Sequence, residues 1–520
     1  MSRCIPVLLM VVALIGCGET VKPSVPPPGS GAIPKDQAKP DKAGRLLAGV
    51  AKVDITNRKI IPANDPLYVK ALVLQNGSTT AVIVTVDAVA IGEIGTIGND
   101  YLGKVRARLE KELKIAPAHV IVNASHCHGS VCADVDDKTV EAVKLAVRNM
   151  VPVTVGVGVG QENRIMENRR LKLKNGKEVD VRHAYSLPPD EQVAEVGPID
   201  PQIGILRLDR KDGRTLAVVY NFACHPIMGV PNEGNTADIV GFASKVIENN
   251  LSDGTIALFL QGCGGDINPI LYKEVNLPRN AEPLGNLLGL SVLRAVRKIT
   301  TGNAVNLTVL NNKLGLPRAD RTKQIDAMVL EQARLVKSLR GTTLNLKTFM
   351  HLTVKYNLSS EFPSYYSHRY LHEKMIGRED LNKLDAANRR NISQYLENIY
   401  VMEQITRLQT NLALLRKHHE TNRMAGMKPL QVEVVGLRVG EFVLVTFPGE
   451  LTVEIGLNIK KASPHKQTFV AGYTNGYIYY TPTAKQLLNV GGAQEDSDCL
   501  LAPEWQKLFE DKVAELLKKL

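Results

Sequence analysis

The sequence predicts an α/β protein in which layers of mixed β-sheet are flanked by helices. Apolar runs of strand length recur along the chain, and stretches of helical period separate several of them, which is the order typical of α/β layers. A chain of 520 residues is long enough for one large catalytic domain or two to three ordinary ones. Its hydrophobic content of 44% and charged content of 22% are typical of a soluble globular protein.

Predicted strands and helices alternate through most of the folded body, which begins at residues 46–56. Amphipathic patterns predict helices at residues 100–114 and 138–150, and the chain closes on a further amphipathic helix at 502–520. Apolar runs of strand length lie at residues 71–76, 81–89, 119–125, 204–209, 216–223, 255–262 and 442–449.

Residues 318 to about 430 differ from the rest of the body. Two long stretches in this segment, DAMVLEQARLVKSLR and NRRNISQYLENIYVMEQITRLQTNLALLRKHHE, are charged and periodic at helical spacing. They predict a helical insertion, packed as a hairpin over one side of the body. No internal repeat is visible in the sequence.

The amino-terminal residues predict an export signal. Residues 1–17 combine a basic start at Arg3, an apolar run too short to span a bilayer, and the sequence LIGC, which ends at Cys17. LIGC is similar to a bacterial lipobox, in which the cysteine becomes the lipidated amino terminus; the alternative is an ordinary secretory signal with an incidental cysteine. Residues 18–45 are rich in proline, glycine and charge, and predict a disordered tether between a lipid anchor and the body at 46–520. We therefore expect a lipoprotein of the bacterial cell envelope, on a periplasmic or extracellular face.

The charge pattern does not favour nucleic acid as a partner. The formal net charge of +11 is modest for this length, the basic residues are spread along the chain, and no compact basic-aromatic motif appears. Attraction to an anionic membrane surface is at least as plausible. The oligomeric state is not determined by the sequence.

Four polar clusters each follow an apolar run of strand length. They are His126 with His128, His225 with Pro226, residues 263–269, and Glu450. Ligand sites gather at the carboxyl ends of strands in α/β sheets, so these clusters predict one shared pocket.

The clusters contain a set of side chains suited to a metal ion. Two histidines at positions i and i+2 of extended backbone point to the same face, so His126 and His128 can both address one ion or substrate while Cys127 points away. With His225 and Glu450 they form a set of nitrogen and oxygen ligands suited to zinc. The alternatives are satisfied polar residues for the histidine pair, and a carboxylate favoured by the macrodipole of a following helix for Glu450.

Five motifs, SHCHGS, NFACHP, GCGGDINP, FPGELT and GYTNGYIYYTPT, resemble motifs of the neutral/alkaline non-lysosomal ceramidases and occur in the same order. The opening GVAKVDIT and the segment ENRR resemble that family as well, so the resemblance covers residues 46 to about 500. It implies the fold of the ceramidase catalytic domain and zinc as cofactor. The zinc ligands that it implies are His126, His225, Glu450 and Tyr480, with Tyr477 and Tyr479 of the same run as alternatives to Tyr480.

The same resemblance implies hydrolysis of an N-acyl amide by a zinc-activated water. It places His128 near that water or the substrate carbonyl, and it makes Arg169 the arginine of the site. The family's serine in Gly-Asp-x-Ser-Pro is replaced by Asn268, and its threonine between the two histidines by Cys127. The sequence ends soon after the tyrosine-rich run, so we expect no counterpart in it of the immunoglobulin-like domain of longer members.

Two classes of function follow. The first is an exported, lipid-anchored zinc amidohydrolase acting on a small-molecule or lipid N-acyl substrate: a sphingolipid-like amide, an N-acyl sugar or envelope component, or an ester. The second is a non-catalytic binding lipoprotein with the same fold, which Asn268 favours and the retained zinc ligands oppose. A redox protein built on Cys127 and Cys132 is a more distant alternative, because their spacing lacks a redox-motif context.

Other candidate residues carry less weight. His368 and His372 are spaced i, i+4 on a predicted helix and are interpreted as a solvated face, and His418 and His419 as surface residues. Asp238 either lies near the site or caps the helix that follows it. Apart from Cys4 and Cys17, an odd number of cysteines without the spacing of a disulfide framework predicts packing roles: Cys127, Cys132, Cys224, Cys263 and Cys499.

Overall fold

The computed structural model describes residues 45–59, 62–181, 187–272, 274, 276–303, 306–489 and 492–520. The predicted signal peptide with its Cys17, and the predicted tether up to residue 44, lie outside these residues. No helix in the described ranges is long and apolar enough to cross a membrane.

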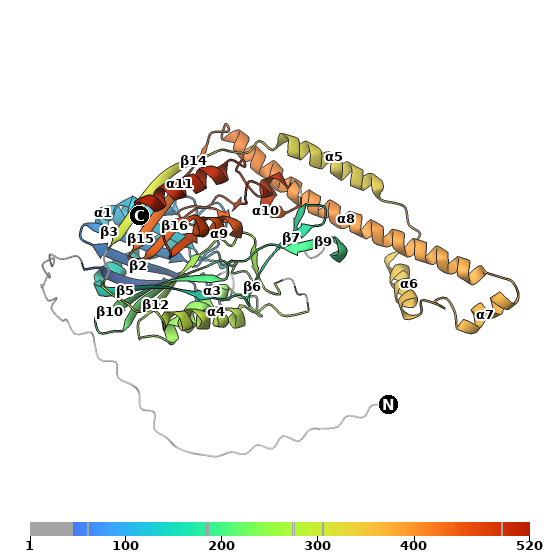
Figure 1. The fold of residues 1–520 in the computed structure, drawn as a ribbon, viewed down its shortest axis with the longest axis horizontal. Helices are drawn as coiled ribbons and strands as arrows, with labels where there is room; N and C mark the ends of the chain where they lie inside the picture. Colours follow the sequence, from blue (N-terminus) through green and yellow to red (C-terminus); the bar gives the residue numbers. More distant parts are fainter. Residues whose placement is uncertain are drawn as a thin grey trace, which may run out of the picture. The chain divides into compact units, whose positions relative to one another are not determined.

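The larger β-sheet has eight strands in the order β12-β11-β10-β5-β1-β2-β3-β4 (Figure 1). The outer pairs β3–β4 and β11–β12 are parallel and the inner pairs are antiparallel, so the predicted α/β class with mixed sheets is confirmed. The strands are β1 (Leu47–Asp54), β2 (Tyr68–Asn76), β3 (Thr79–Val86), β4 (Val120–Ala124), β5 (Val151–Gln161), β10 (Gln202–Arg210), β11 (Thr215–Phe222) and β12 (Ile256–Gln261).

The two edge strands of this sheet, β4 and β12, lie next to each other although they stand at opposite ends of the strand order. The backbone N–H of Gln261 on β12 donates to the side-chain oxygen of Asn123 on β4 at 2.9 Å. The amide of Asn123 donates in turn to the Gly472 carbonyl at 2.8 Å and to Thr474 at 2.9 Å. The carboxyl ends of β4, β11 and β12 are therefore brought to one place.

A second sheet, of order β14-β15-β16-β18, encloses a core together with the first. Strand β2 contributes side chains to two hydrophobic cores, because successive side chains of a strand point to opposite faces. Leu72 and Leu74 face the core between the sheets, and Val69, Ala71 and Val73 face helices. Gly204 on β10 lies against the Phe469 ring at a distance that leaves no room for a Cβ atom. The strands are β14 (Leu307–Leu316), β15 (Leu430–Val439), β16 (Phe442–Thr446) and β18 (Thr468–Ala471).

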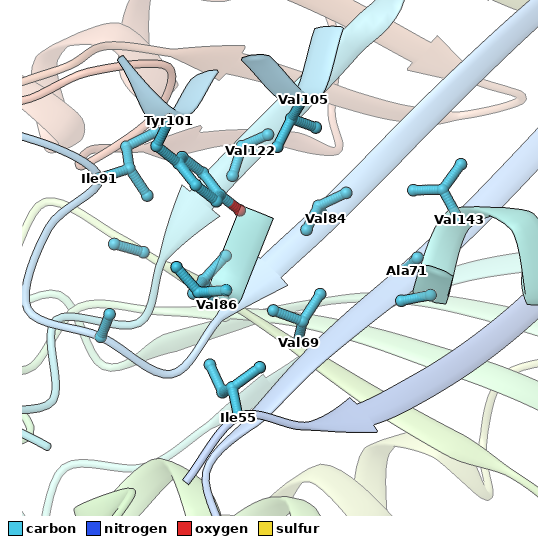
Figure 2. Close-up of a cluster of buried hydrophobic side chains, with 14 of the residues drawn as sticks. Ile55, Val69, Ala71, Val84, Val86, Ile91, Tyr101, Val105, Val122 and Val143 are labelled. Atoms are coloured by element: carbon cyan, nitrogen blue, oxygen red, sulfur yellow. The ribbon is translucent and has the colours of Figure 1, made fainter. Parts of the chain in front are cut away.

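Three pairs of helices cover the sheets through apolar clusters. Figure 2 shows one cluster, where Val69 and Val84 pack with Tyr101, Val105 and Val143 from two helices. The predicted helices at 100–114, 138–150 and 502–520 are confirmed within a few residues at their ends. The pairs are α1 (Tyr101–Leu113) with α2 (Val135–Arg148), α3 (Asp238–Asn249) with α4 (Ala281–Val296), and α9 (Val453–Ala462) with α11 (Trp505–Lys519).

The segment between β14 and β15 is helical. These two strands pair with each other from Leu307↔Val439 to Leu316↔Leu430 and form a β-hairpin. The helical segment is the connection between the two strands of this hairpin (Figure 1). α5 packs on α8 through a small apolar cluster, while α6 and α7 pack on the amino-terminal part of α8. The helices are α5 (Thr322–Ser338), α6 (Leu346–Leu358), α7 (Ser367–Met375) and α8 (Asp380–Met424).

Candidate metal centre

His126 follows β4 directly, but its backbone is not extended. Its φ of 68° is in the left-handed region, so the expectation that His126 and His128 share a face of an extended strand is wrong. The backbone N–H of His126 donates to the Ala88 carbonyl at 2.9 Å, and its Nδ1 lies 2.6 Å from the Val89 carbonyl oxygen. Two carbonyls from the loop after β3 therefore fix both the backbone and the ring of His126.

His225 follows β11 and is held in a similar way. Its backbone N–H and its Nδ1 each lie 3.0 Å from the Ile267 carbonyl oxygen. Ile267 belongs to β13 (Ile267–Pro269), which pairs with β6 (Met166–Asn168). A carbonyl oxygen only accepts hydrogen bonds, so the Nδ1 atoms of both histidines carry protons, and in the neutral form of each ring the Nε2 atom carries the lone pair.

Glu450 lies on the two-residue strand β17 (Glu450–Leu451), which pairs in parallel with β19 (Tyr480–Thr481), so that Glu450 and Tyr480 are register partners. Helix α9 begins only at Val453, so Glu450 does not lie in its first turn. One carboxylate oxygen of Glu450 accepts from the Tyr473 hydroxyl at 3.2 Å, and the other accepts a short hydrogen bond from the Tyr477 hydroxyl. The carboxylate is thus oriented by two tyrosines.

These three side chains converge in the interior. His225 Nε2 lies 3.1 Å and His126 Nε2 3.6 Å from Glu450 Oε2, and the ligand atoms of all three lie within 4.8 Å of one another. All three side chains are buried. Within the described residues, the clustered His, Cys, Asp and Glu side chains that could hold a metal ion are these three.

The protonation states make this group fit a cation. Burial lowers the pKa of His126 to about 4, so the ring is neutral at neutral pH. Burial would raise the pKa of Glu450, but His126, His225 and the Tyr477 hydroxyl together hold that pKa below its usual range, so Glu450 is ionised. Two imidazole lone pairs and a carboxylate therefore face one another, an arrangement that a divalent cation such as zinc stabilises.

The tyrosines around Glu450 have different positions. Tyr480 is stacked beside His225, with ring centroids 6.5 Å apart and an interplanar angle of 21°. Burial and the charge of Glu450 raise the pKa values of Tyr473 and Tyr477, which keep their protons and donate to Glu450. Tyr479 packs its ring against His418, with centroids 4.6 Å apart. Sequence reasoning missed Tyr473, although it opens the same tyrosine-rich segment.

Arg169 and Asn268 are neighbours in the site. The Arg169 guanidinium donates to Asn268 Oδ1 at 3.1 Å, to the Gly265 carbonyl at 2.6 Å and to Glu495 at 2.6 Å. It also lies over the Tyr480 ring, 5.5 Å from the centroid. Because the carbonyl oxygen of Asn268 accepts from Arg169, its side-chain NH₂ group is the part that can donate elsewhere.

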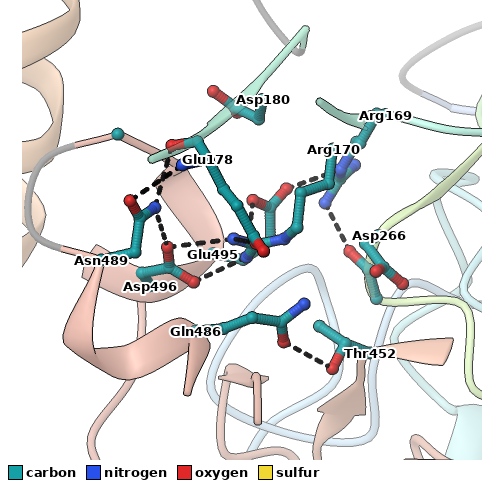
Figure 3. A network of polar contacts seen from close by, with 12 residues as sticks. Arg169, Arg170, Glu178, Asp180, Asp266, Thr452, Gln486, Asn489, Glu495 and Asp496 are labelled. Carbon is teal, nitrogen blue, oxygen red and sulfur yellow. Dashed lines mark hydrogen bonds and ion pairs between the residues drawn. The ribbon is translucent and has the colours of Figure 1, made fainter. Parts of the chain in front are cut away.

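Figure 3 shows the buried polar network around Arg169 and Arg170. Arg170 donates to Asp496 at 2.6 Å and to Glu178 at 3.0 Å, next to the Arg169–Glu495 pair. Glu495 and Asp496 lie on α10 (Gln494–Ser497), and neither was recognised from the sequence, where they form an ordinary run of acidic residues. This network holds the Arg169 guanidinium through Glu495.

His128 lies at the exposed edge of the site. Its side chain is exposed, and its ring stands edge-on to that of His126, with centroids 5.6 Å apart. Cys127, between the two histidines, is fully buried and points into the protein. His128 is therefore close to His126 but accessible from outside.

Asp238 holds the loop that follows His225. It is the first residue of α3, and its carboxylate accepts the backbone N–H groups of Met228, Gly229 and Ile239. Burial raises the pKa of Asp238 to about 6, partly offset by these N–H groups. The capping role is not observed, because the N-cap position of α3 is Ala237 and has no side-chain capping hydrogen bond. Asp238 instead binds the loop that begins three residues after His225.

The other histidines considered as candidates differ in their exposure to solvent. His368 and His372 are exposed on α7, as expected for a solvated face. The interpretation of His418 as a surface residue is wrong: it is buried, and its Nε2 lies 2.6 Å from Asp498. The carbonyl of Asp498 accepts the backbone N–H of Tyr480 at 3.1 Å, so Asp498 links α8 to the strand that bears Tyr480. Packing of α8 onto the body decided this, and helical periodicity did not reveal it.

The cysteines give no support to redox chemistry. The five cysteines among the described residues are free, and all but Cys132 are buried. Burial raises the pKa of Cys132 to about 11 and that of Cys127 further, which disfavours the reactive thiolate.

Comparisons with known proteins agree with this fold. The sequence matches no protein-family model and no curated protein. Among solved structures, that of neutral ceramidase from Pseudomonas aeruginosa superposes with a TM-score of 0.57 over 92% of this chain and 75% of that one, at 17% identity. The chain has the neutral ceramidase fold. A ceramidase complexed with C2 matches with the same TM-score over 92% of this chain and 76% of that one, at 16% identity. At such identities the ceramidase likeness establishes the fold alone.

Proposed function

We propose that this protein is a zinc-dependent amidohydrolase that cleaves an N-acyl amide bond with water. The convergence of two imidazole lone pairs and one carboxylate, with every Nδ1 proton directed to a backbone carbonyl, carries the proposal. The ceramidase fold is consistent with it. The metal would be held by His126, His225 and Glu450, with Tyr480 as a further ligand.

A zinc ion bound there supplies a Lewis acid and lowers the pKa of a bound water towards about 7. Side chains of the protein would orient the ligand Glu450, stabilise the developing negative charge and supply a proton. Tyr473 and Tyr477 orient Glu450, and Arg169 holds Asn268 so that its NH₂ group donates to the oxygen of the amide as negative charge develops there. His128, at the exposed edge, is placed to bring a proton to the leaving nitrogen.

The substrate class is suggested by a cavity of about 560 Å³ whose lining includes Tyr477, the residue that donates to Glu450. Its lining combines apolar side chains such as Ile91 and Ile478 with the charged side chains of Glu93, Lys313 and Glu433. Such a lining suits a substrate with a polar portion beside its acyl group, as in an N-acyl sugar or a lipid amide with a polar headgroup.

Metal analysis and a substrate panel test this function together. Purified protein is expected to contain about one zinc per chain and to hydrolyse some members of a panel of N-acyl sphingoid, N-acyl sugar and ester substrates, with loss of turnover in a chelator. Zinc without hydrolysis across the panel would favour the binding lipoprotein. Hydrolysis that persists without metal would contradict the proposal.

Replacing Asn268 by alanine is expected to lower turnover by roughly 10- to 1000-fold without loss of zinc, because one donor to the developing oxyanion is removed. Asn268→Ser should remain active, since a hydroxyl also donates. The readouts are kcat and zinc content, with the exposed Asn276→Ala as control. An inactive wild type whose Asn268→Ser variant hydrolyses amides would show that the native chain is a binding relative of such enzymes.

We further propose that Cys17 carries a lipid anchor and that the mature protein resides in the cell envelope. The LIGC sequence and the proline-rich segment after it support this. In a bacterial host, intact-mass analysis should find diacylglycerol on Cys17 of the wild type and none on Cys17→Ser, with unchanged hydrolysis. A wild-type amino terminus that is cleaved elsewhere would contradict the anchor.

A further inference from the structure

Helix α6 has a packed face and, unusually for a surface helix, an exposed apolar face. Its one face is packed: Phe349 stacks on Tyr395 of α8 with ring centroids 4.4 Å apart, and the Tyr356 hydroxyl donates to Asp385 at 2.7 Å. A second face is apolar and exposed. Leu346, Met350, Val354 and Leu358 are 62%, 54%, 53% and 82% exposed.

These four residues follow one another at i, i+4, i+8 and i+12, so they form a continuous stripe along the helix. Exposed apolar residues scattered singly need no explanation, but a stripe along a whole helix marks an interaction surface. Helix α7 and the residues that flank it continue the apolar character with further exposed side chains: Tyr365, Tyr366, Leu371, Met375 and Ile376.

A basic row runs directly beside the apolar stripe. Lys347, His351 and Lys355 are each one residue after a member of the stripe, and they also recur at i, i+4 and i+8. α6 contains no acidic residue. From 346 to 376 there are four lysines and arginines (Lys347, Lys355, Arg369, Lys374) and two glutamates (Glu361, Glu373).

We propose that the α6–α7 surface docks on an anionic lipid membrane, with α6 lying in the interfacial plane. An apolar stripe beside a basic row is the pattern of interfacial helices, whose apolar side enters the headgroup boundary while lysines contact anionic lipid. A second copy of this chain fits less well, because two identical basic rows would face each other across the interface. This surface binds independently of the predicted lipid anchor and of the catalytic proposal.

Peptide-resolved hydrogen exchange on the full chain tests the proposal, because it reports on α6 itself whatever the amino terminus does. With phosphatidylglycerol-containing vesicles, amides of residues 346–376 should exchange at least several-fold more slowly than with vesicles of phosphatidylcholine alone. Met350→Ser/Leu358→Ser should abolish the difference, whereas Leu330→Ser, which alters an exposed leucine on α5, should not. Lys347→Ala should weaken partitioning by about fivefold, the share of one lysine near an anionic surface.

Three results would overturn the proposal. The first is exchange at α6 that anionic vesicles leave unchanged. The second is protection that survives in Met350→Ser/Leu358→Ser while unfolding of that variant matches the wild type. The third is a lipid-independent dimer in analytical ultracentrifugation that the double substitution dissociates, because it would identify the stripe as an interface between copies.

Discussion

Replacing His126 or His225 by alanine, or Glu450 by glutamine, is expected to remove the bound zinc and abolish amide hydrolysis in a chain that still folds. Each change leaves two of the three converging side chains, and these two together with the neutral Tyr480 hydroxyl are too weak a ligand set to retain zinc against solvent. Glutamine is chosen at position 450 because its oxygen can still accept from a tyrosine hydroxyl, which limits the cost of leaving Tyr473 and Tyr477 unpaired.

The measurement is zinc per chain by mass spectrometry of the metal, together with circular dichroism and turnover. His368→Ala is the matched control, because His368 is exposed on α7 far along the chain from the cluster. A variant that keeps full zinc occupancy would show that the replaced residue is no ligand. A variant that loses zinc and also unfolds would instead assign the residue a structural part.

Replacing Glu495 by alanine is expected to destabilise the protein by about 3–5 kcal/mol, the largest stability effect in the site. Arg169 is almost fully buried, and Glu495 accepts from its Nε at 2.6 Å. Removing the carboxylate leaves a buried guanidinium without its partner, which costs far more than the net worth of the ion pair. Burial opposes the charge on Arg169, and Glu495 holds the pKa of Arg169 well above its usual value.

Urea denaturation followed by circular dichroism measures this effect. Glu495→Gln should lose less, because the amide oxygen still accepts from Arg169, and Glu515→Ala, which breaks ion pairs on the surface of α11, should leave the transition midpoint unchanged. Equal stability of Glu495→Ala and wild type would mean that water or another acceptor satisfies Arg169.

Several features of the fold could be predicted because they depend on local pattern. The runs at 71–76, 81–89 and 216–223 are mostly apolar, and the structure buries the corresponding strands on both faces between cores. Strand β5 was not predicted, because its alternating glycines weaken the apolar pattern. The left-handed φ of His126 was not predicted either, because no local residue pattern indicates it.

The sequence by itself determined the α/β class and the residue types that could bind a metal, because strand and helix periods and ligand chemistry are local properties. His126, His225 and Glu450 were singled out by their position after apolar runs. Tertiary structure alone decided that they meet, since the edge strands β4 and β12 had to come together and β17 had to pair with β19.

The same holds for the groups behind the site. Arg169 and Glu495 are 326 residues apart in the chain, and His418 and Asp498 are 80 apart. The sequence around a single glutamate or histidine does not indicate which residue it will pair with. A buried charge is tolerated only where the whole fold brings its counter-charge within hydrogen-bonding distance. Packing of distant segments, and no pattern along the chain, therefore decided which polar residues became part of the site.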